Sequence, residues 1–186
     1  MSLRFDFLDK RPIVIALAGS NGAGKSTFYE SFLADAGLRF VNADVLSEAL
    51  DVTAYEAAEL AASIRFSLVA QRESFVFETV LSDPVGEKVD ILASYVAFGY
   101  TVVLIFISID SPEESISRVA MRVSQGDHDV PDDKLRGRFE RTQANRQRAI
   151  RCLPHVIVYS NCDLAKPYQL VEHYENGQSA LTRPME

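Results

Sequence analysis

Short runs of β-branched or aromatic residues alternate along the chain with longer stretches in which apolar residues recur at helical spacing. Such alternation is typical of a parallel β-sheet with helices packed on both of its faces. The short runs predict five strands, at residues 13–18, 38–41, 74–78, 101–109 and 155–159. The longer stretches predict helices at about residues 25–36, 44–50, 54–72, 84–98, 112–124 and 134–151. Because no repeat, low-complexity tract or linker interrupts the pattern, we expect residues 1–186 to form a single α/β domain.

A glycine-rich segment joins the first predicted strand to the first predicted helix, and it satisfies the pattern G-x-x-x-x-G-K-[ST]. In such a loop the backbone N–H groups point into one concavity, beside the positive dipole end of the following helix. We therefore expect it to bind the phosphates of ATP or GTP, with Lys25 reaching the β- and γ-phosphates and the Ser26 hydroxyl binding Mg²⁺. The loop comprises Gly19, Ser20, Asn21, Gly22, Ala23, Gly24, Lys25, Ser26 and Thr27.

ABC-type ATPases have a similar phosphate-loop sequence, but they also need an LSGGQ-like signature and an apolar strand that ends in Asp-Glu. Neither occurs here, because LS at 81–82 continues as DP and ID at 109–110 continues as S. That class is therefore disfavoured.

Carboxylates follow several of the predicted strands, where an open parallel sheet binds its ligands. With the strand order 2-3-1-4-5, as in P-loop kinases, the third strand lies beside the phosphate loop, and Glu78 at its end would orient Mg²⁺ or its water. Asp44, after the second strand, would lie on the acceptor side, where a carboxylate can take the proton of an attacking hydroxyl. The alternative for Asp44 is an N-cap of the next helix. For Asp110 the N-cap interpretation is favoured, because DSPEE at 110–114 is a strong helix-start signal.

Charge is unevenly distributed along the chain. The 19 Lys and Arg residues against 26 Asp and Glu residues give a net charge of −7, whereas residues 118–151 hold nine basic and five acidic residues. An acidic chain is a poor generic binder of nucleic acid or of anionic membranes, so the confined basic segment predicts a compact anionic ligand.

Arginines dominate this basic segment. Arg118 and Arg122 are four residues apart on one predicted helix, and Arg136 and Arg138 lie on the next. Two arginine-bearing helices, joined by a loop at 125–133 that contains Gly and Pro, predict a lid at about 118–141 that closes over the nucleotide phosphates. For any single arginine, a solvent-exposed helix face remains the alternative.

The apolar runs and the cysteines suggest an intracellular protein. The longest apolar stretch, 102–109, is far shorter than the roughly 20 residues of a membrane-spanning helix. Residues 13–18 imitate a signal-peptide core, but cleavage there would remove the strand before the phosphate loop, so we interpret them as structure. Cys152 and Cys162 lack metal or redox spacing, which fits thiols in a reducing compartment. We expect a cytoplasmic location.

Four segments, in this order, resemble the zeta-toxin-like family of P-loop kinases: GSNGAGKST at 19–27, VNAD at 41–44, FETVLS at 77–82 and RVAMRVSQGDHDVPDDKLRGRFER at 118–141. The resemblance extends from residue 13 to about 160, and the last segment is especially similar to a short bacterial subgroup described as predicted ATPases or kinases.

The resemblance implies a kinase that uses ATP or GTP to phosphorylate a sugar hydroxyl of UDP-N-acetylglucosamine and that an antitoxin protein inhibits. On matching positions it implies a five-stranded P-loop fold with a helical lid and a set of site residues. These are Lys25 and Ser26 in the phosphate loop, Asp44 as base, Glu78 and Thr79 on the acceptor side, and Arg122 with Arg136 or Arg138 in the lid. From the arginine pattern itself, we also expect Arg118 to contact the nucleotide.

Two other functions stay open. A 5′-hydroxyl polynucleotide kinase is disfavoured by the net charge of −7, by the absence of Trp and by the lack of an interleaved aromatic and basic groove. A nucleotide-gated interaction module would bind ATP only to set the position of the lid. Our expected partner is a small-molecule acceptor, with no nucleic acid and no membrane.

Overall fold

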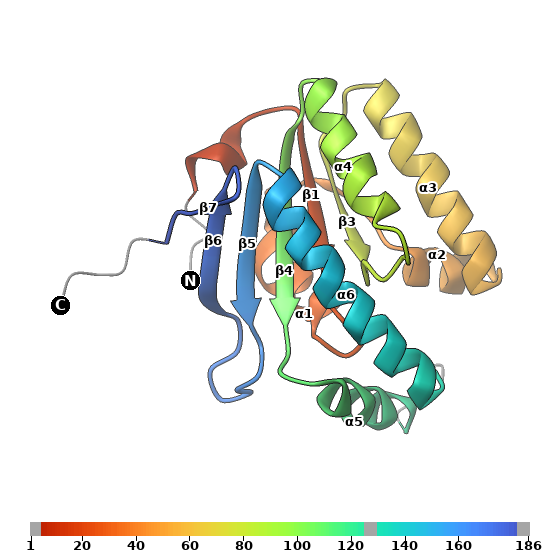
Figure 1. Ribbon diagram of the computed structural model, residues 1–186. Coiled ribbons are helices and arrows are strands. Elements are labelled where there is room, and N and C mark those ends of the chain that lie inside the picture. Colours follow the sequence, from red (N-terminus) through yellow and green to blue (C-terminus); the bar gives the residue numbers. More distant parts are fainter. Residues whose placement is uncertain (1–4, 125–129, 182–186) are drawn as a thin grey trace.

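A mixed sheet in the order β2-β3-β1-β4-β5-β6-β7 forms the centre of the computed structural model, which describes residues 5–124 and 130–181 (Figure 1). The strands are β1 Ile13–Ala18, β2 Arg39–Val41, β3 Phe75–Thr79, β4 Thr101–Ser108, β5 His155–Ser160, β6 Gln169–Glu175 and β7 Gln178–Ser179. The first five are parallel in the predicted order 2-3-1-4-5.

The predicted count of five strands is wrong, because β6 and β7 extend the sheet to seven as antiparallel strands. Their sequence carries little strand signal. Along β6, exposed residues alternate with partly buried ones over the first four positions, and His173 is its one buried residue. A strand of this kind lacks the continuous apolar run by which the inner strands were recognised.

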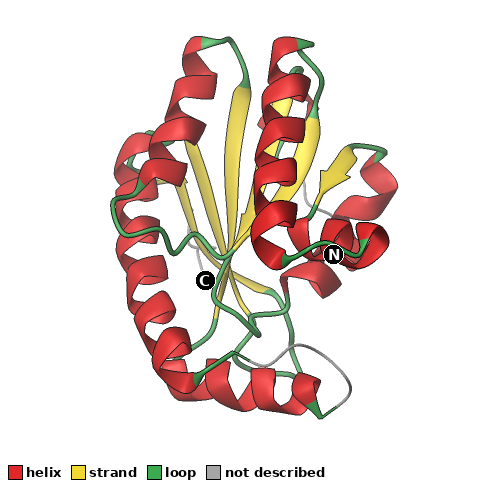
Figure 2. Ribbon diagram, turned by 90° about the vertical axis from the view of Figure 1, so that its right-hand side faces the viewer, coloured by secondary structure: helices red, strands yellow, loops and turns green. Residues whose placement is uncertain are grey.

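Helices cover both faces of the sheet (Figure 2). Their bounds are α1 Lys25–Phe28, α2 Ala43–Leu50, α3 Ala54–Ala70, α4 Glu87–Ala97, α5 Pro112–Val123 and α6 Asp132–Cys152. Apolar side chains of α3, α4 and α6 pack on one face, against Val102, Leu104 and Phe106 of β4. The opposite face of β4 packs against α1 and a 3₁₀ turn at Asp6–Asp9. Both layers thus hold the carboxyl ends of β1 and β3 in place.

The predicted helix at 25–36 is segmented. After α1 the chain forms a π-helical turn, Tyr29–Leu33, and a 3₁₀ turn, Ala34–Ala36. The helices α5 and α6 of the predicted lid are present, and Figure 1 places α5 beyond the carboxyl end of β4. Most of the loop expected to join them, residues 125–129, lies outside the described residues.

Two N-cap interpretations, the alternative one for Asp44 and the favoured one for Asp110, are wrong, because a neighbouring residue is the cap in each case. Asn42, not Asp44, caps α2, because its side chain accepts a hydrogen bond from the Asp44 backbone N–H at 2.8 Å. Ser111, not Asp110, caps α5, where the Ser111 hydroxyl accepts from the Glu114 N–H at 3.1 Å. Asp44 therefore lies in the first turn of α2, where the helix dipole favours a carboxylate. Over the described residues, none of the helices is both long and apolar enough to span a bilayer.

Candidate active site

The phosphate loop turns sharply between β1 and α1, and two of its glycines are required for that turn. Gly22 and Gly24 adopt φ angles of 74° and 92°, in the left-handed region that side chains disfavour. A Cβ atom on Gly24 would lie 2.6 Å from Asn161 Nδ2 and 2.8 Å from Tyr168 Oη. The loop is therefore pressed closely against the residues that follow β5.

Side chains outside the loop hold its carbonyl groups. Asn161 Nδ2 donates to Ala23 O at 2.9 Å, and Tyr168 Oη donates to Gly24 O at 2.9 Å. From α5, Ser115 Oγ donates to Asn21 O at 2.7 Å. Because these carbonyls point toward the protein, the backbone N–H groups are directed to the inner side of the loop, which is the arrangement that binds phosphate.

Lys25 is buried at the base of the loop and meets the carboxylate of Glu78. Its Nζ lies 3.6 Å from Glu78 Oε1 and donates to Ser20 O at 3.2 Å. Burial lowers the pKa of Lys25, while the carboxylates of Glu78 and Asp44 oppose that shift and the charge of Arg122 adds to it. The charges of Asp44 and Arg122 therefore both act on the phosphate-loop lysine.

The other oxygen of Glu78 joins the loop to β2. Glu78 Oε2 accepts hydrogen bonds from Ser26 Oγ and from Asn42 Nδ2, each at 3.0 Å. The two residues expected to bind Mg²⁺, Ser26 and Glu78, are therefore in direct contact. A hydroxyl and a carboxylate side by side fit the oxygen donors that Mg²⁺ prefers.

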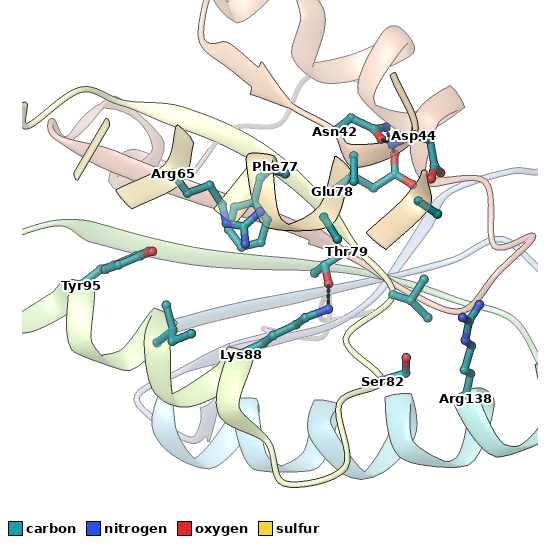
Figure 3. Close-up of a pocket in the computed structure, with 16 residues that line it drawn as sticks. Asn42, Asp44, Arg65, Phe77, Glu78, Thr79, Ser82, Lys88, Tyr95 and Arg138 are labelled. Carbon is teal, nitrogen blue, oxygen red and sulfur yellow. Dashed lines mark hydrogen bonds between the residues drawn. The ribbon is translucent and has the colours of Figure 1, made fainter. Parts of the chain in front are cut away.

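A cavity of about 330 Å³ opens beside this contact, between β3 and the helices α2, α3, α4 and α6 (Figure 3). Asp44, Glu78 and Thr79, the residues predicted on the acceptor side, all line it. Asp44 is exposed there, whereas the Thr79 hydroxyl already accepts hydrogen bonds from Lys88 Nζ at 3.2 Å and Leu81 N at 3.1 Å. The remaining lining residues are Asn42, Ala43, Ala54, Ala58, Ala61, Arg65, Phe77, Val80, Ser82, Lys88, Ile91, Tyr95 and Arg138.

The predicted lid arginines occupy different places. Arg138 lines the cavity, and Arg122 lies within electrostatic range of Lys25. Arg118 lies against the outside of the loop, donating to Gly22 O at 3.4 Å and to Asn161 O at 2.7 Å. Arg136 instead forms an ion pair with Glu113 across α5 and α6. Of the four arginines, Arg138 thus lies at the cavity and Arg122 acts on Lys25. The contact of any of the four with a nucleotide stays a prediction.

Sequence reasoning missed several residues of the site. Arg65, Lys88 and Tyr95 line the cavity, but they lie within helices whose packing no sequence motif predicts. One signal was available for Arg65, because Ala54, Ala58 and Ala61 precede it at helical spacing and mark a hollowed helix face.

The order of the five parallel strands and the phosphate loop between β1 and α1 define a P-loop fold of the kind found in P-loop kinases. The family model of the zeta toxins, described as Zeta toxin, matches residues 6–171, so the chain belongs to that family. Among curated proteins, no match was found.

Solved structures agree in fold. The AvrRxo1-ORF1:AvrRxo1-ORF2 complex with sulphate ions aligns with a TM-score of 0.73 at 20% identity, over 93% of this chain and 61% of that chain. The same complex with ATP gives the same values. The PezAT chromosomal toxin–antitoxin system of Streptococcus pneumoniae aligns with a TM-score of 0.66 at 17% identity, over 88% of this chain and 72% of that chain. This chain therefore spans less than two thirds of the AvrRxo1 chain that it resembles.

Proposed function

We propose that the protein transfers the γ-phosphoryl group of ATP, with Mg²⁺, to a hydroxyl group of a small molecule bound in the cavity. The observation that carries this proposal is the position of Glu78, which contacts Lys25 and Ser26 of the phosphate loop and also lines the cavity. A nucleotide phosphate on the loop and an acceptor in the cavity would therefore be neighbours. Phosphoryl transfer depends on such proximity, because two reactants that are bound side by side need not meet by diffusion.

The loop and Lys25 would bind the nucleotide. On binding, Lys25 would exchange its ion pair with Glu78 for contacts with the β- and γ-phosphates. Mg²⁺, when bound, neutralises negative charge on these phosphates, and Ser26 with Glu78 would hold it. Arg122 would also help to neutralise negative charge on the γ-phosphate, because its own charge acts on Lys25 nearby.

Asp44 would act as the base. As the acceptor oxygen forms its bond to the γ-phosphorus, its proton passes to the Asp44 carboxylate, and the bond from that phosphorus to the β–γ bridging oxygen breaks. ADP carries the electron pair of the broken bond. The exposure of Asp44 at the cavity, beyond the loop, supports this assignment.

Family membership supports a first test with UDP-N-acetylglucosamine as the acceptor and an antitoxin as the protein partner. The PezAT structure is by its name a toxin–antitoxin system, which supports the second of these proposals. An ATP-dependent enzyme with a nucleotide-sugar acceptor would act in the cytoplasm.

The direct test is incubation of the full chain with labelled ATP, Mg²⁺ and a cell metabolite extract, followed by mass identification of new phosphorylated species. UDP-N-acetylglucosamine and a 5′-hydroxyl oligonucleotide are supplied in separate reactions. We expect a phosphorylated small molecule that is absent with the Lys25→Ala variant. ATP binding without product in any reaction would contradict the proposal and favour a nucleotide-gated module, and a salt-sensitive oligonucleotide product would favour a polynucleotide kinase.

A further inference from the structure

Two histidines and a glutamate share one face of the sheet where β5 pairs with β6, two strands that lie side by side in Figure 1. His155 is directly opposite Glu175 in this antiparallel register, and His173 precedes Glu175 by two residues on the same strand. Opposite residues, and residues two apart on a strand, project on the same face of a sheet. His155 begins β5, so the group lies at the amino ends of the parallel strands, opposite the edge that carries the phosphate loop.

The three side chains are close enough to share one metal ion. One ligand nitrogen of each imidazole and one carboxylate oxygen of Glu175 all lie within 4.8 Å of one another. Two such ligand atoms on a tetrahedral zinc ion are about 3.4 Å apart. His173 Nε2 lies 3.5 Å from Glu175 Oε1, which is already that spacing. The other separations exceed it by at most about 1.4 Å, a distance that small side-chain movements can close.

Two imidazole nitrogens of this group are buried without a hydrogen-bond partner. His155 Nδ1 and His173 Nε2 are both shielded from solvent, and neither has such a partner among residues 5–124 and 130–181. His173 as a whole is only 7% exposed. Buried polar atoms are nearly always paired, because leaving one unpaired costs free energy. A metal ion would supply the partner that His173 Nε2 lacks.

Both imidazoles are held in the form that binds metal. Burial lowers the pKa of His155 and of His173, although the Glu175 carboxylate opposes the shift. The rings are therefore neutral at pH 7, and a neutral imidazole is a metal ligand. Aromatic contacts also fix their orientation, because Phe7 is stacked on His155 with ring centroids 3.8 Å apart and the Phe5 centroid is 4.8 Å from that of His173.

We propose that His155, His173 and Glu175 bind one Zn²⁺ ion. Two imidazole nitrogens and one carboxylate oxygen suit zinc, whereas Mg²⁺ and Ca²⁺ prefer oxygen ligands alone. Three protein ligands leave a fourth position for water, which can enter past the exposed Glu175 side chain. Lys10, whose positive charge acts on His155, is also exposed, so solvent screens its repulsion of the ion.

The ion would stabilise the antiparallel extension of the sheet. Strand β7 pairs with β6, and β6 pairs with β5, so the β5–β6 ladder ties both added strands to the parallel part of the sheet. A ligand that binds the folded chain and not the unfolded chain raises stability by mass action. The inference does not depend on phosphoryl transfer, because none of the three proposed ligands lines the cavity.

The test measures Zn²⁺ binding and its effect on unfolding. The full chain is treated with a chelator, freed of it by buffer exchange and titrated with Zn²⁺ by calorimetry in excess Mg²⁺, so that sites made of oxygen atoms hold Mg²⁺. We expect one tight Zn²⁺ site per chain. At free Zn²⁺ of about 100 times Kd, the midpoint of thermal unfolding should rise by about 5–10 °C. Ca²⁺ at the same concentration should cause no rise.

Variants assign the binding to this group. Glu175→Gln and His155→Gln should each weaken Zn²⁺ affinity by about 100-fold or more, since even the outer partners of a metal site contribute roughly 10–100-fold. Circular dichroism of the chelator-treated Glu175→Gln variant should match wild type, because Glu175 is exposed. Cys162→Ser changes a different group of potential ligands, formed with Asp110 and Glu114, and should leave the affinity unchanged. A wild type that does not bind Zn²⁺, or binding that Glu175→Gln leaves unchanged, would overturn the inference.

Discussion

Lys25 and Glu78 form an ion pair of 3.6 Å that is almost fully shielded from solvent, with side-chain exposures of 7% and 11%. The lysine that reaches for nucleotide phosphate is therefore held in advance by a carboxylate at the end of β3. That carboxylate also contacts the Ser26 hydroxyl, at 3.0 Å. When a nucleotide binds, its phosphates have to replace Glu78 as the partner of Lys25, while the oxygen atoms of Ser26 and Glu78 stay together.

Glu78→Gln separates these two roles of the carboxylate. Loss of the negative charge removes a competitor for Lys25 and a repulsive group near the γ-phosphate, so binding of metal-free nucleotide should not weaken. The same loss removes an Mg²⁺ ligand, so the Mg²⁺ concentration for half-maximal transfer should rise by about tenfold or more. Titration of Mg²⁺ at fixed ATP measures this shift, with Glu48→Gln on the exposed side of α2 as the matched control. An unchanged Mg²⁺ requirement would remove Glu78 from the metal site.

The hydroxyl of Tyr168 supports the phosphate loop from outside. Tyr168→Phe removes the hydroxyl that donates to Gly24 O at 2.9 Å and that also forms a hydrogen bond with the Thr27 side chain, and it leaves that carbonyl without this donor. We expect a loss of about 1 kcal/mol in the free energy of unfolding and weaker nucleotide binding, measured by urea denaturation and by calorimetry. Tyr55→Phe, on an exposed tyrosine of α3, serves as the control. If ATP affinity is the same in both variants, the outer hydrogen bonds do not set the shape of the loop.

Two histidines far from the cavity predict how stability depends on pH. His155 and His173 lie on β5 and β6 beside Phe7, whose ring centroid is 3.8 Å from that of His155. Burial lowers the pKa of both imidazoles below 6.5, with the Glu175 carboxylate opposing the shift. The unfolded chain therefore binds more protons, and the free energy of unfolding should fall as the pH drops below about 6.5.

His173→Gln should flatten this dependence, because glutamine does not titrate. Urea denaturation of wild type and variant between about pH 5 and pH 7 compares the two slopes. Equal slopes would show that His173 does not contribute to the loss of stability in acid.

Local signals in the sequence were sufficient for the inner part of this fold. The apolar runs of β1 and β4 predicted buried parallel strands, and the motif ending at Lys25 predicted the turn between β1 and α1. The inferred order of strands then placed Glu78 beside the loop, and the contact with Ser26 confirms that placement.

What the sequence did not predict depends on packing between distant segments. Arg65 and Lys88 become cavity residues only once α3 and α4 pack over β3, and helical spacing alone gives no register for that packing. The α2 cap was assigned to Asp44 as one alternative because both Asn and Asp suit an N-cap, and the choice between them depends on where the helix begins. Strand β6 was missed because most of its side chains are exposed to some degree.

Single-turnover transfer from γ-labelled ATP, with wild type and Asp44→Asn measured side by side on the acceptor found in the metabolite screen, tests the central claim most directly. If Asp44 is the base of a P-loop phosphotransferase, the transfer rate falls by about 10²–10⁴-fold. ATP affinity, measured by calorimetry, and transfer by the Glu48→Gln control then stay close to wild type. Transfer by Asp44→Asn at a rate near that of the wild type would contradict the claim.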